Sequence, residues 1–444
     1  MEISLLYGRR ELVPKVDIPT KLPDTVQVLP TLAVTTSVRC LRCNAMTARD
    51  DGGLPHGQYY CPQCINLGRV STLDSFYHVP EPNQFSPPSE PLTWRGQLSP
   101  LQSRVAEEVR KAMANHQRHL LWAVTGAGKT EMMFSTIEQA LKKRERVCIA
   151  SPRVDVCLEL FPRLQRAFRK TPIVLLHGQQ EQPYRYCQLT VCTTHQLLRF
   201  YHAFDLLIVD EVDSFPYAAN QQLLFATNQA KKPTGGLLLM TATPGKTLLR
   251  EVRRRQLIVS YLPLRYHGHL LPEIKRIKIS SKWRCRLAHG RLPLTVIHWV
   301  HRHVQTKKRF LMFVPHVADL TPVANALKKI IPQTAFATVY AADDERLTKV
   351  QKMREGQYQF LITTTILERG VTFPAIDVCV IGADDEVFSS SALVQIAGRV
   401  GRSADCPNGQ VTFFIGDNTL AISSAVRQIK YLNRLGRKLQ CRDV

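Results

Sequence analysis

The feature that most constrains the fold of this chain is a repeated alternation of short apolar runs with amphipathic helical stretches. From about residue 92 the runs are HLLWAV, VCIAS, PIVLLHG, LTVCTT, LLIVDE and GLLLMTAT, and after about residue 262 they are RFLMFV, FATVYA, FLITTT, DVCVIGAD and VTFFIG. Continuous apolar runs separated by helices are typical of parallel strands that are buried on both faces of a sheet. The sequence therefore predicts two successive α/β domains.

A basic segment, LPLRYHGHLLPEIKRIKISSKWRCR, joins the two series. Trp283 lies within it and could either stack on a base or belong to the core. The final helical stretch places Ile422, Val426 and Ile429 on one face and basic residues elsewhere.

The charge of the chain is strongly unbalanced. Its 444 residues include 59 Lys and Arg against 36 Asp and Glu, a formal net charge of +23. Such a surface is either simply solvated or suited to a polyanion, nucleic acid first and an anionic membrane face second. The start, MEISLLYGRRELVPK, lacks the apolar length of a secretory signal, and no run approaches the ~18 apolar residues of a membrane span. We expect a soluble, cytoplasmic protein that can still dock at the inner face of the cell membrane.

Two C-x2-C pairs near the start form a candidate metal site. Cys40 and Cys43 lie in CLRC, Cys61 and Cys64 lie in CPQC, and 17 residues separate the pairs. This spacing predicts a structural Zn²⁺ site with four thiolate ligands, although a redox dithiol would use the same pairs. His56 lies in the loop but is not needed for a closed site. We expect the other cysteines to be buried, reduced thiols; they are Cys148, Cys157, Cys187, Cys192, Cys285, Cys379, Cys406 and Cys441.

The stretch AVTGAGKTE, residues 123–131, follows an apolar run and precedes a helical one, the context of a phosphate-binding loop. Glycines there let backbone N–H groups approach phosphates, Lys129 neutralises β- and γ-phosphate charge, and Thr130 can bind Mg²⁺. A glycine-bearing turn without a ligand is the alternative. The predicted nucleotide contacts are Thr125, Gly126, Ala127, Gly128, Lys129, Thr130 and Glu131.

Further polar residues complete a candidate hydrolytic site. The run LLIVDEVD delivers Asp210, which can hold Mg²⁺, and Glu211, which can polarise the attacking water. Gln102, in TWRGQLSPLQ, could recognise an adenine edge. In LVQIAGRVGR a helix would place Gln395, Arg399 and Arg402 on one face, where the arginines could stabilise γ-phosphate charge or simply be solvated.

In this order, these motifs resemble a superfamily 2 helicase. The set is TWRGQLSPLQ, AVTGAGKT, SPR, TTHQ, DEVD, TAT, TTTILERGVTF and QIAGRVGR. The four-cysteine module ahead of the motor, DEVDSFPY and LPLRYHGHLLPE are similar to the ComFA family of late-competence ATPases, which is related to the PriA replication-restart helicases. The resemblance implies an N-terminal segment (1–35), a zinc module (36–76), a proline-rich linker (77–91) and two tandem RecA-like domains, the ATPase domain 1 (92–265) and the helicase C-terminal domain 2 (266–444).

The resemblance also implies roles for individual residues. Asp213, Thr241 and Thr243 would couple hydrolysis to domain movement, and Gly370, Gln395, Arg399 and Arg402 would complete the nucleotide site. The implied DNA contacts are Ser151, Arg153, Thr193, Thr194, Thr364 and Thr372. The usual PTR element of the family reads SPR here, which puts the DNA contacts around it in doubt.

Three functional hypotheses remain at this point. The first, implied by the resemblance, is an ATP-dependent single-stranded DNA translocase for uptake of transforming DNA, with ATP, Mg²⁺ and Zn²⁺ as cofactors. Its implied partners are a membrane DNA-uptake channel and a companion protein, ComFC. The second is a PriA-like replication-restart or repair helicase. The third is an ATP-gated docking module that binds nucleic acid or a partner protein without appreciable turnover.

Overall fold

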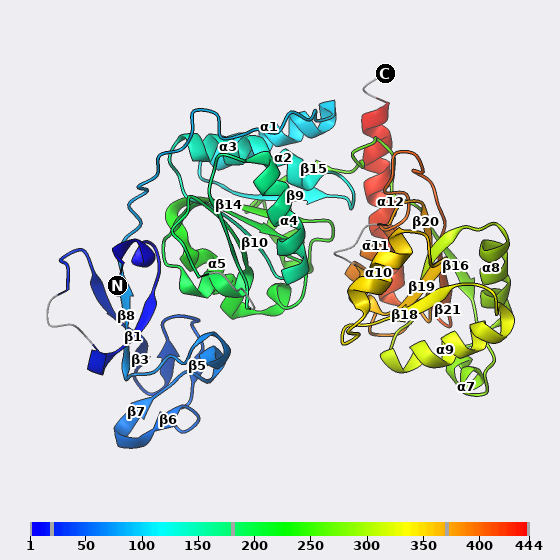
Figure 1. Cartoon of the computed structure of the whole chain (residues 1–444), viewed down its shortest axis with the longest axis horizontal. Helices are drawn as coiled ribbons and strands as arrows, with labels where there is room; N and C mark the ends of the chain where they lie inside the picture. The colour runs from blue at the N-terminus through cyan, green and yellow to red at the C-terminus, as the bar shows by residue number, and fades with distance from the viewer. Residues whose placement is uncertain (1, 18–21, 179–182, 369–372, 442–444) are drawn as a thin grey trace. The chain divides into compact units, whose positions relative to one another are not determined.

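The computed structural model describes residues 2–17, 22–178, 183–368 and 373–441. The described residues form two compact units, one from those within 1–122 and 129–261 and the other from those within 123–128 and 262–444 (Figure 1). Among the described residues, no helix is both long and apolar enough to cross a lipid bilayer.

The core of the first unit is a seven-stranded sheet in the order β11-β12-β10-β13-β14-β9-β15. Its strands are β9 (Arg118–Ala123), β10 (Val147–Ser151), β11 (Ile173–Leu176), β12 (Leu189–Thr193), β13 (Phe204–Asp210), β14 (Lys231–Thr241) and β15 (Ile258–Leu262). The neighbours from β11 to β9 pair in parallel, as the apolar runs predict. Parallel strands bring the residues after β9, β13 and β14 to one edge of the sheet.

Helices before and between these strands cover the sheet. They are α1 (Pro100–Ala114), α2 (Lys129–Met132), α3 (Phe134–Lys142), α4 (Val154–Ala167), α5 (Gln221–Ala230) and α6 (Lys246–Arg253), with 3-10 turns η5 (Thr194–Arg199) and η6 (Tyr217–Ala219). Buried residues of α3 such as Ile137 and Leu141 recur at helical spacing, so one face of the helix packs against the sheet.

The N-terminal part of the first unit is built from small antiparallel sheets. One has the order β1-β8-β2, from β1 (Glu11–Pro14), β2 (Gln27–Pro30) and β8 (Asp74–His78). The others join β3 (Leu32–Val34), β4 (Val38–Cys40) and β5 (Met46–Thr47), and β6 (Gly53–Leu54) with β7 (Gln58–Tyr59). The 3-10 turns are η1 (Ile3–Leu6), η2 (Lys15–Asp17), η3 (Pro55–Gly57) and η4 (Pro62–Leu67). The chain start therefore shares a sheet with the residues that follow the cysteine pairs.

A buried ion pair joins the proline-rich segment to the large sheet. Arg146 Nη1 lies 2.5 Å from Glu81 Oε2, and neither side chain is exposed to solvent. Arg146 Nη2 also donates to Tyr184 Oη at 2.6 Å, and the guanidinium lies 4.9 Å from the centre of the Tyr186 ring. The proline-rich segment is extended and non-helical, as predicted. Its start is held to the seven-stranded sheet by the ion pair between Glu81 and Arg146.

The second unit contains a six-stranded sheet in the order β16-β21-β20-β17-β19-β18, in which each strand pairs in parallel with its neighbours. Its strands are β16 (Ile274–Lys278), β17 (Arg309–Phe313), β18 (Phe336–Val339), β19 (Phe360–Thr363), β20 (Ile376–Ile381) and β21 (Val411–Ile415). Its helices are α7 (Trp283–Ala288), α8 (Leu294–Gln305), α9 (Val317–Ile330), α10 (Arg346–Arg354), α11 (Ser390–Ala397), α12 (Leu420–Gln440) and the 3-10 turn η7 (Thr365–Glu368). Trp283 is buried in the core of this unit, not available for base stacking.

The prediction that the eight remaining cysteines are buried is wrong for three of them. Cys285 and Cys441 are exposed and Cys406 is half-buried. Cys285 lies on the short helix α7 and Cys441 follows the last turn of α12, so neither faces the sheet.

Candidate functional site

The phosphate-binding loop lies between β9, which ends at Ala123, and α2, which begins at Lys129. Gly126 and Gly128 have φ values of 78° and 75°, a left-handed backbone that favours glycine. Glycine loops between a strand and a helix let backbone N–H groups approach phosphate oxygens. The predicted context of strand, glycine loop and helix is therefore present.

The loop lysine meets the first carboxylate of DEVD. Lys129 Nζ lies 3.4 Å from Asp210 Oδ1, with side chains 18% and 10% exposed. Asp210 is the last residue of β13, and its Oδ1 also accepts the N–H of Glu211 at 2.8 Å. The parallel sheet thus brings together two residues 81 positions apart, on which the predicted phosphate and Mg²⁺ contacts depend.

Glu211 and Thr130 are two further polar residues at the edge of the sheet where Lys129 meets Asp210. Glu211 has a φ of 55°, uncommon for a residue with a side chain and frequent at functional sites. Its Oε2 accepts the hydroxyl of Ser214 at 3.3 Å. Thr130 is buried at the start of α2. A hydroxyl and a carboxylate are oxygen donors of the kind that Mg²⁺ binds, so Thr130 and Asp210 fit that ion.

The three predicted coupling residues form one hydrogen-bonded cluster. Thr241 Oγ1 donates to Asp213 Oδ1 at 2.5 Å, and Thr243 Oγ1 donates to Asp213 Oδ2. The N–H of Thr243 donates to Thr241 Oγ1 at 2.9 Å. The loop after β13 and the end of β14 are thereby joined; the coupling role itself stays a prediction.

The side chain of Gln102 forms a hydrogen bond at the start of its own helix. It is the third residue of α1, where its Oε1 accepts the N–H of Ser99 at 2.8 Å while Ser99 Oγ accepts the N–H of Gln102 at 3.3 Å. This capping box stabilises the start of the helix. Recognition of adenine by Gln102 stays a prediction.

In the second unit, the predicted arginines follow α11. Gln395 and Arg399 are buried and Arg402 is half-buried. Arg399 Nε donates to the Glu368 carbonyl and Arg402 Nε to the Gly398 carbonyl, both at 3.1 Å. Two further predicted residues, Gly370 and Thr372, lie outside the described residues.

Arg265 is a candidate phosphate contact that the sequence motifs do not include. It is 2% exposed, Nη1 donates to the Gly401 carbonyl, and Nε and Nη2 have no hydrogen-bond partner among the described residues. Burial, together with the nearby Arg402, lowers the pKa of Arg265 to about 9. A methyl group added to Gly126 would lie within 4.0 Å of the side chains of Arg265 and Arg402. A buried cation whose N–H donors lack partners is unfavourable, so Arg265 is suited to bind an anion beside the phosphate-binding loop.

The predicted DNA contacts are mostly inaccessible in this structure. Ser151, Thr193, Thr194 and Thr364 are buried. Arg153 is half-buried, and its guanidinium makes two hydrogen bonds to Asp155, at 3.1 and 3.0 Å. A DNA contact through the buried hydroxyls would require these strand ends to open, and all these contacts stay predictions.

The four cysteines lie together in a buried cluster that could hold the predicted metal ion. Their sulfur atoms lie within 4.8 Å of one another and all four side chains are buried. Cys40 Sγ is 3.9 Å from Cys64 Sγ, and Cys43 Sγ is 3.7 Å from Cys61 Sγ. A tetrahedron with Zn–S bonds of ~2.3 Å has edges of about 3.8 Å, so the cluster fits Zn²⁺. His56 is exposed and outside the cluster.

Arg42 supports the metal centre from within the first cysteine pair. Its buried guanidinium donates through Nε to Cys64 Sγ at 3.4 Å, and through Nη2 to the Cys64 carbonyl at 3.2 Å. The pKa of the Cys64 thiol is lowered, by hydrogen bonds from the other three cysteines and then by the Arg42 charge. Arg42 thus favours the thiolate that a metal needs.

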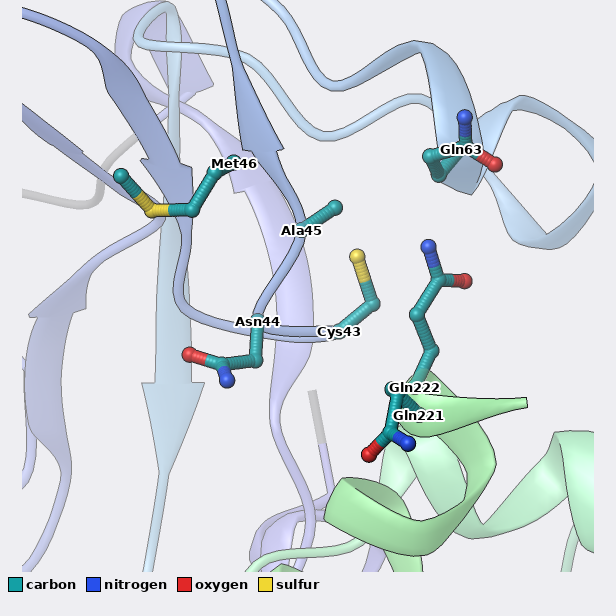
Figure 2. Close-up of a pocket in the computed structure, with 7 residues that line it drawn as sticks. All are labelled: Cys43, Asn44, Ala45, Met46, Gln63, Gln221 and Gln222. Carbon is teal, nitrogen blue, oxygen red and sulfur yellow. The ribbon is translucent and has the colours of Figure 1, made fainter. Parts of the chain in front are cut away.

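A pocket of about 330 Å³ lies where the zinc module meets α5. Figure 2 shows its lining, which combines residues around the cysteine pairs with two residues at the start of α5; they are Cys43, Asn44, Ala45, Met46, Gln63, Gln221 and Gln222. Asn220 caps α5 by accepting the N–H groups of Gln222 and Leu223. The zinc module therefore lies against α5, one of the helices that cover the seven-stranded sheet, and side-chain amides line the junction.

Comparison with known proteins places these features in a family. A family model described as "Type III restriction enzyme, res subunit" matches residues 95–246, and one described as "Helicase conserved C-terminal domain" matches residues 265–404. The chain is 42% identical to "Competence protein ComFA" of Bacillus subtilis (strain 168) over 410 residues, covering 91% of this chain and 88% of that protein. It is 41% identical over 395 residues to the protein of the same name from Streptococcus pneumoniae (strain ATCC BAA-255 / R6), covering 89% and 90%.

Among solved structures, the fold is similar to "S. cerevisiae Dbp5 bound to RNA and ADP BeF3", with a TM-score of 0.52 and 14% identity, covering 77% of this chain and 97% of that one. The predicted fold class, two RecA-like parallel-sheet domains preceded by a four-cysteine module, is confirmed.

Proposed function

The chain belongs to the ComFA family of competence proteins, and from that premise we propose that it is an ATP-driven translocase that moves single-stranded DNA into the cell during transformation. It is an ATP-hydrolysing, helicase-like enzyme associated with competence. Lys129 and Asp210 carry the proposed chemistry, because their contact joins the phosphate loop to the carboxylates at the end of β13.

Each residue has a defined part in the proposed hydrolysis. Lys129 neutralises charge on the β- and γ-phosphates, and Glu211 accepts a proton from the attacking water. Arg399 and Arg402 oppose the charge that develops on the γ-phosphate when the two RecA-like domains close on the nucleotide. Asp213, Thr241 and Thr243 transmit that closure to the DNA-binding segments, so that one hydrolysis cycle advances the strand.

The chain contains residues that could bind two metal ions, Mg²⁺ and Zn²⁺. Mg²⁺, when bound through Thr130 and Asp210, supplies further positive charge to the phosphate oxygens. Zn²⁺ bound by Cys40, Cys43, Cys61 and Cys64 would hold the small module together, a structural and not a hydrolytic function.

The DNA and its route are part of the proposal. The net charge of +23 supports a polyanion partner, and family membership favours single-stranded DNA. We propose docking of this chain at the inner face of the membrane, beside a DNA-uptake channel and a ComFC-like companion. We also retain the proposed domain boundaries at residues 35, 76, 91 and 265.

The proposed translocase is distinguished from a replication-restart helicase by what it does to duplex DNA. We would load the protein with ATP on single-stranded DNA that carries biotin and streptavidin at either end, and record streptavidin displacement. Displacement from one end, without separation of a forked duplex, supports translocation. Robust fork unwinding would support a helicase, and nucleotide-dependent DNA binding with negligible turnover would support a docking module.

A further inference from the structure

The exposed face of α12 carries positive charge that the proposed motor does not use. This 21-residue helix contains no Asp or Glu. At 100° per residue, its exposed basic residues fall within an arc roughly 100° wide, along about 16 Å of helix. We call them the α12 stripe; they are Arg427, Lys430, Arg434, Arg437 and Lys438.

The opposite face fixes the helix on the second unit. Ile422, Ile429 and Leu432 are buried in the core. Asn433 is also buried; its Oδ1 accepts the N–H of Leu271 and its Nδ2 donates to the Leu271 carbonyl, both at 3.0 Å. α12, drawn in red in Figure 1, therefore presents the stripe from a fixed helix and not from a flexible tail.

Little negative charge offsets the stripe. Within the described part of the chain, Arg437 forms an ion pair with Glu273 at 3.4 Å, and both side chains are more than half exposed. Such an exposed pair contributes little. Arg434 lies 5.7 Å from the centre of the half-buried Tyr431 ring. Like charges three and four positions apart repel one another on a helix, so a polyanion laid along the stripe would relieve that repulsion.

We propose that the α12 stripe is a second nucleic-acid site, which binds the phosphate backbone of single-stranded DNA outside the motor's own DNA contacts. The identity of the polymer rests on the proposed function. An anionic membrane is the weaker fit, because interfacial helices insert an apolar face and that of α12 is buried in the protein. The site would hold phosphates without reading bases and would raise the affinity of the motor for its track.

The test compares two variants of the full-length protein that lose the same charge. The stripe variant carries Arg427→Gln, Lys430→Gln, Arg434→Gln and Lys438→Gln. The control carries Lys307→Gln, Lys328→Gln, Lys329→Gln and Arg354→Gln, which are exposed residues elsewhere in the same unit. Binding of a fluorescent single strand is measured by anisotropy without nucleotide, at several salt concentrations. Melting curves establish that both variants fold.

We expect the stripe variant alone to bind the single strand more weakly, by roughly 10- to 100-fold at low salt. The negative slope of log K against log salt should also become shallower by up to about 3, since each lost phosphate contact changes that slope by ~0.7. Replacing Arg427 and Arg434 by Lys should preserve both values, because phosphates accept either cation. Equal affinities and slopes for the stripe and control variants would overturn the proposal. Loss of binding to phosphatidylglycerol-containing vesicles, with DNA binding unchanged, would overturn it in favour of lipid.

This result is separable from the proposed function. If the wild-type protein showed no DNA-stimulated ATP hydrolysis but its DNA binding still depended on the stripe, the translocase would fail and the stripe would stand. If DNA stimulated hydrolysis equally in all three proteins with unchanged DNA dependence and affinity, the stripe alone would fail.

Discussion

Lys129 Nζ lies 3.4 Å from Asp210 Oδ1, so the lysine that would meet the nucleotide phosphates contacts the carboxylate that would meet Mg²⁺. Either substitution, Lys129→Ala or Asp210→Asn, removes charge from the same site. We expect each to lower ATP turnover by about 100-fold or more while leaving the melting temperature nearly unchanged. Phosphate release measured on folded protein checks this. Turnover near the wild-type rate in both variants would contradict the assignment.

Glu211→Gln should separate ATP binding from hydrolysis. The amide keeps the size of the side chain but cannot accept the proton of the attacking water, so turnover should fall by roughly 10²- to 10⁴-fold. Binding of a fluorescent ATP analogue should stay within a few-fold of wild type. If binding and turnover fell together, Glu211 would be a structural residue and not the base.

Arg265→Ala should weaken nucleotide binding selectively. The buried guanidinium has unused donors beside the phosphate loop, so its loss should raise the KM for ATP by about 10-fold, one charge-assisted contact of ~1.4 kcal/mol. The nucleotide-free protein should be as stable as wild type, since an uncompensated buried cation has been removed. Arg276→Ala, at an exposed arginine nearby in sequence, is the matched control. An unchanged KM in the Arg265 variant would exclude the phosphate contact.

Removal of cysteine ligands should release the metal. Cys40→Ala or Cys64→Ala breaks the four-sulfur cluster, so zinc content should fall and soluble yield should drop, because the metal stabilises the module. Metal analysis of purified protein checks this, with exposed Cys285→Ala as the control. A Cys40/Cys64 double variant that kept one zinc per chain would refute the four-cysteine site.

Glu81→Gln should destabilise the first unit strongly. It leaves the Arg146 guanidinium buried without its counter-charge, which typically costs about 3–5 kcal/mol of unfolding free energy. Replacing both partners, as Glu81→Leu with Arg146→Met, should recover much of that loss. Chemical unfolding of the single and double variants measures both effects, and a single variant as stable as wild type would show that the pair is dispensable.

Much of the two large sheets could be predicted from the sequence, because each strand is a continuous apolar run and each helix has its own periodicity. The antiparallel sheet of β1, β8 and β2 was not predicted. Its strands are short and half-polar, and β1 pairs with residues 60 or more positions away, which no local pattern encodes.

The residues of the candidate site likewise fall into those that a local motif predicts and those whose roles depend on tertiary contacts. The phosphate loop, DEVD and the cysteine pairs are local motifs, and their residues meet as expected. Burial of Arg265 and the reach of Arg42 to Cys64 depend on tertiary contacts, so their roles could not be assigned from sequence. The spacing of Ser99 and Gln102 is that of a capping box, a local signal that accounts for Gln102 without any ligand.

The most direct measurement is ATP hydrolysis alone and with single-stranded DNA, duplex DNA or RNA, with Lys129→Ala as the blank. We expect strong stimulation by single-stranded DNA and little by the other polymers. Stimulation greatest with RNA or a forked duplex, or no turnover with any polymer, would contradict the proposed single-stranded DNA translocase.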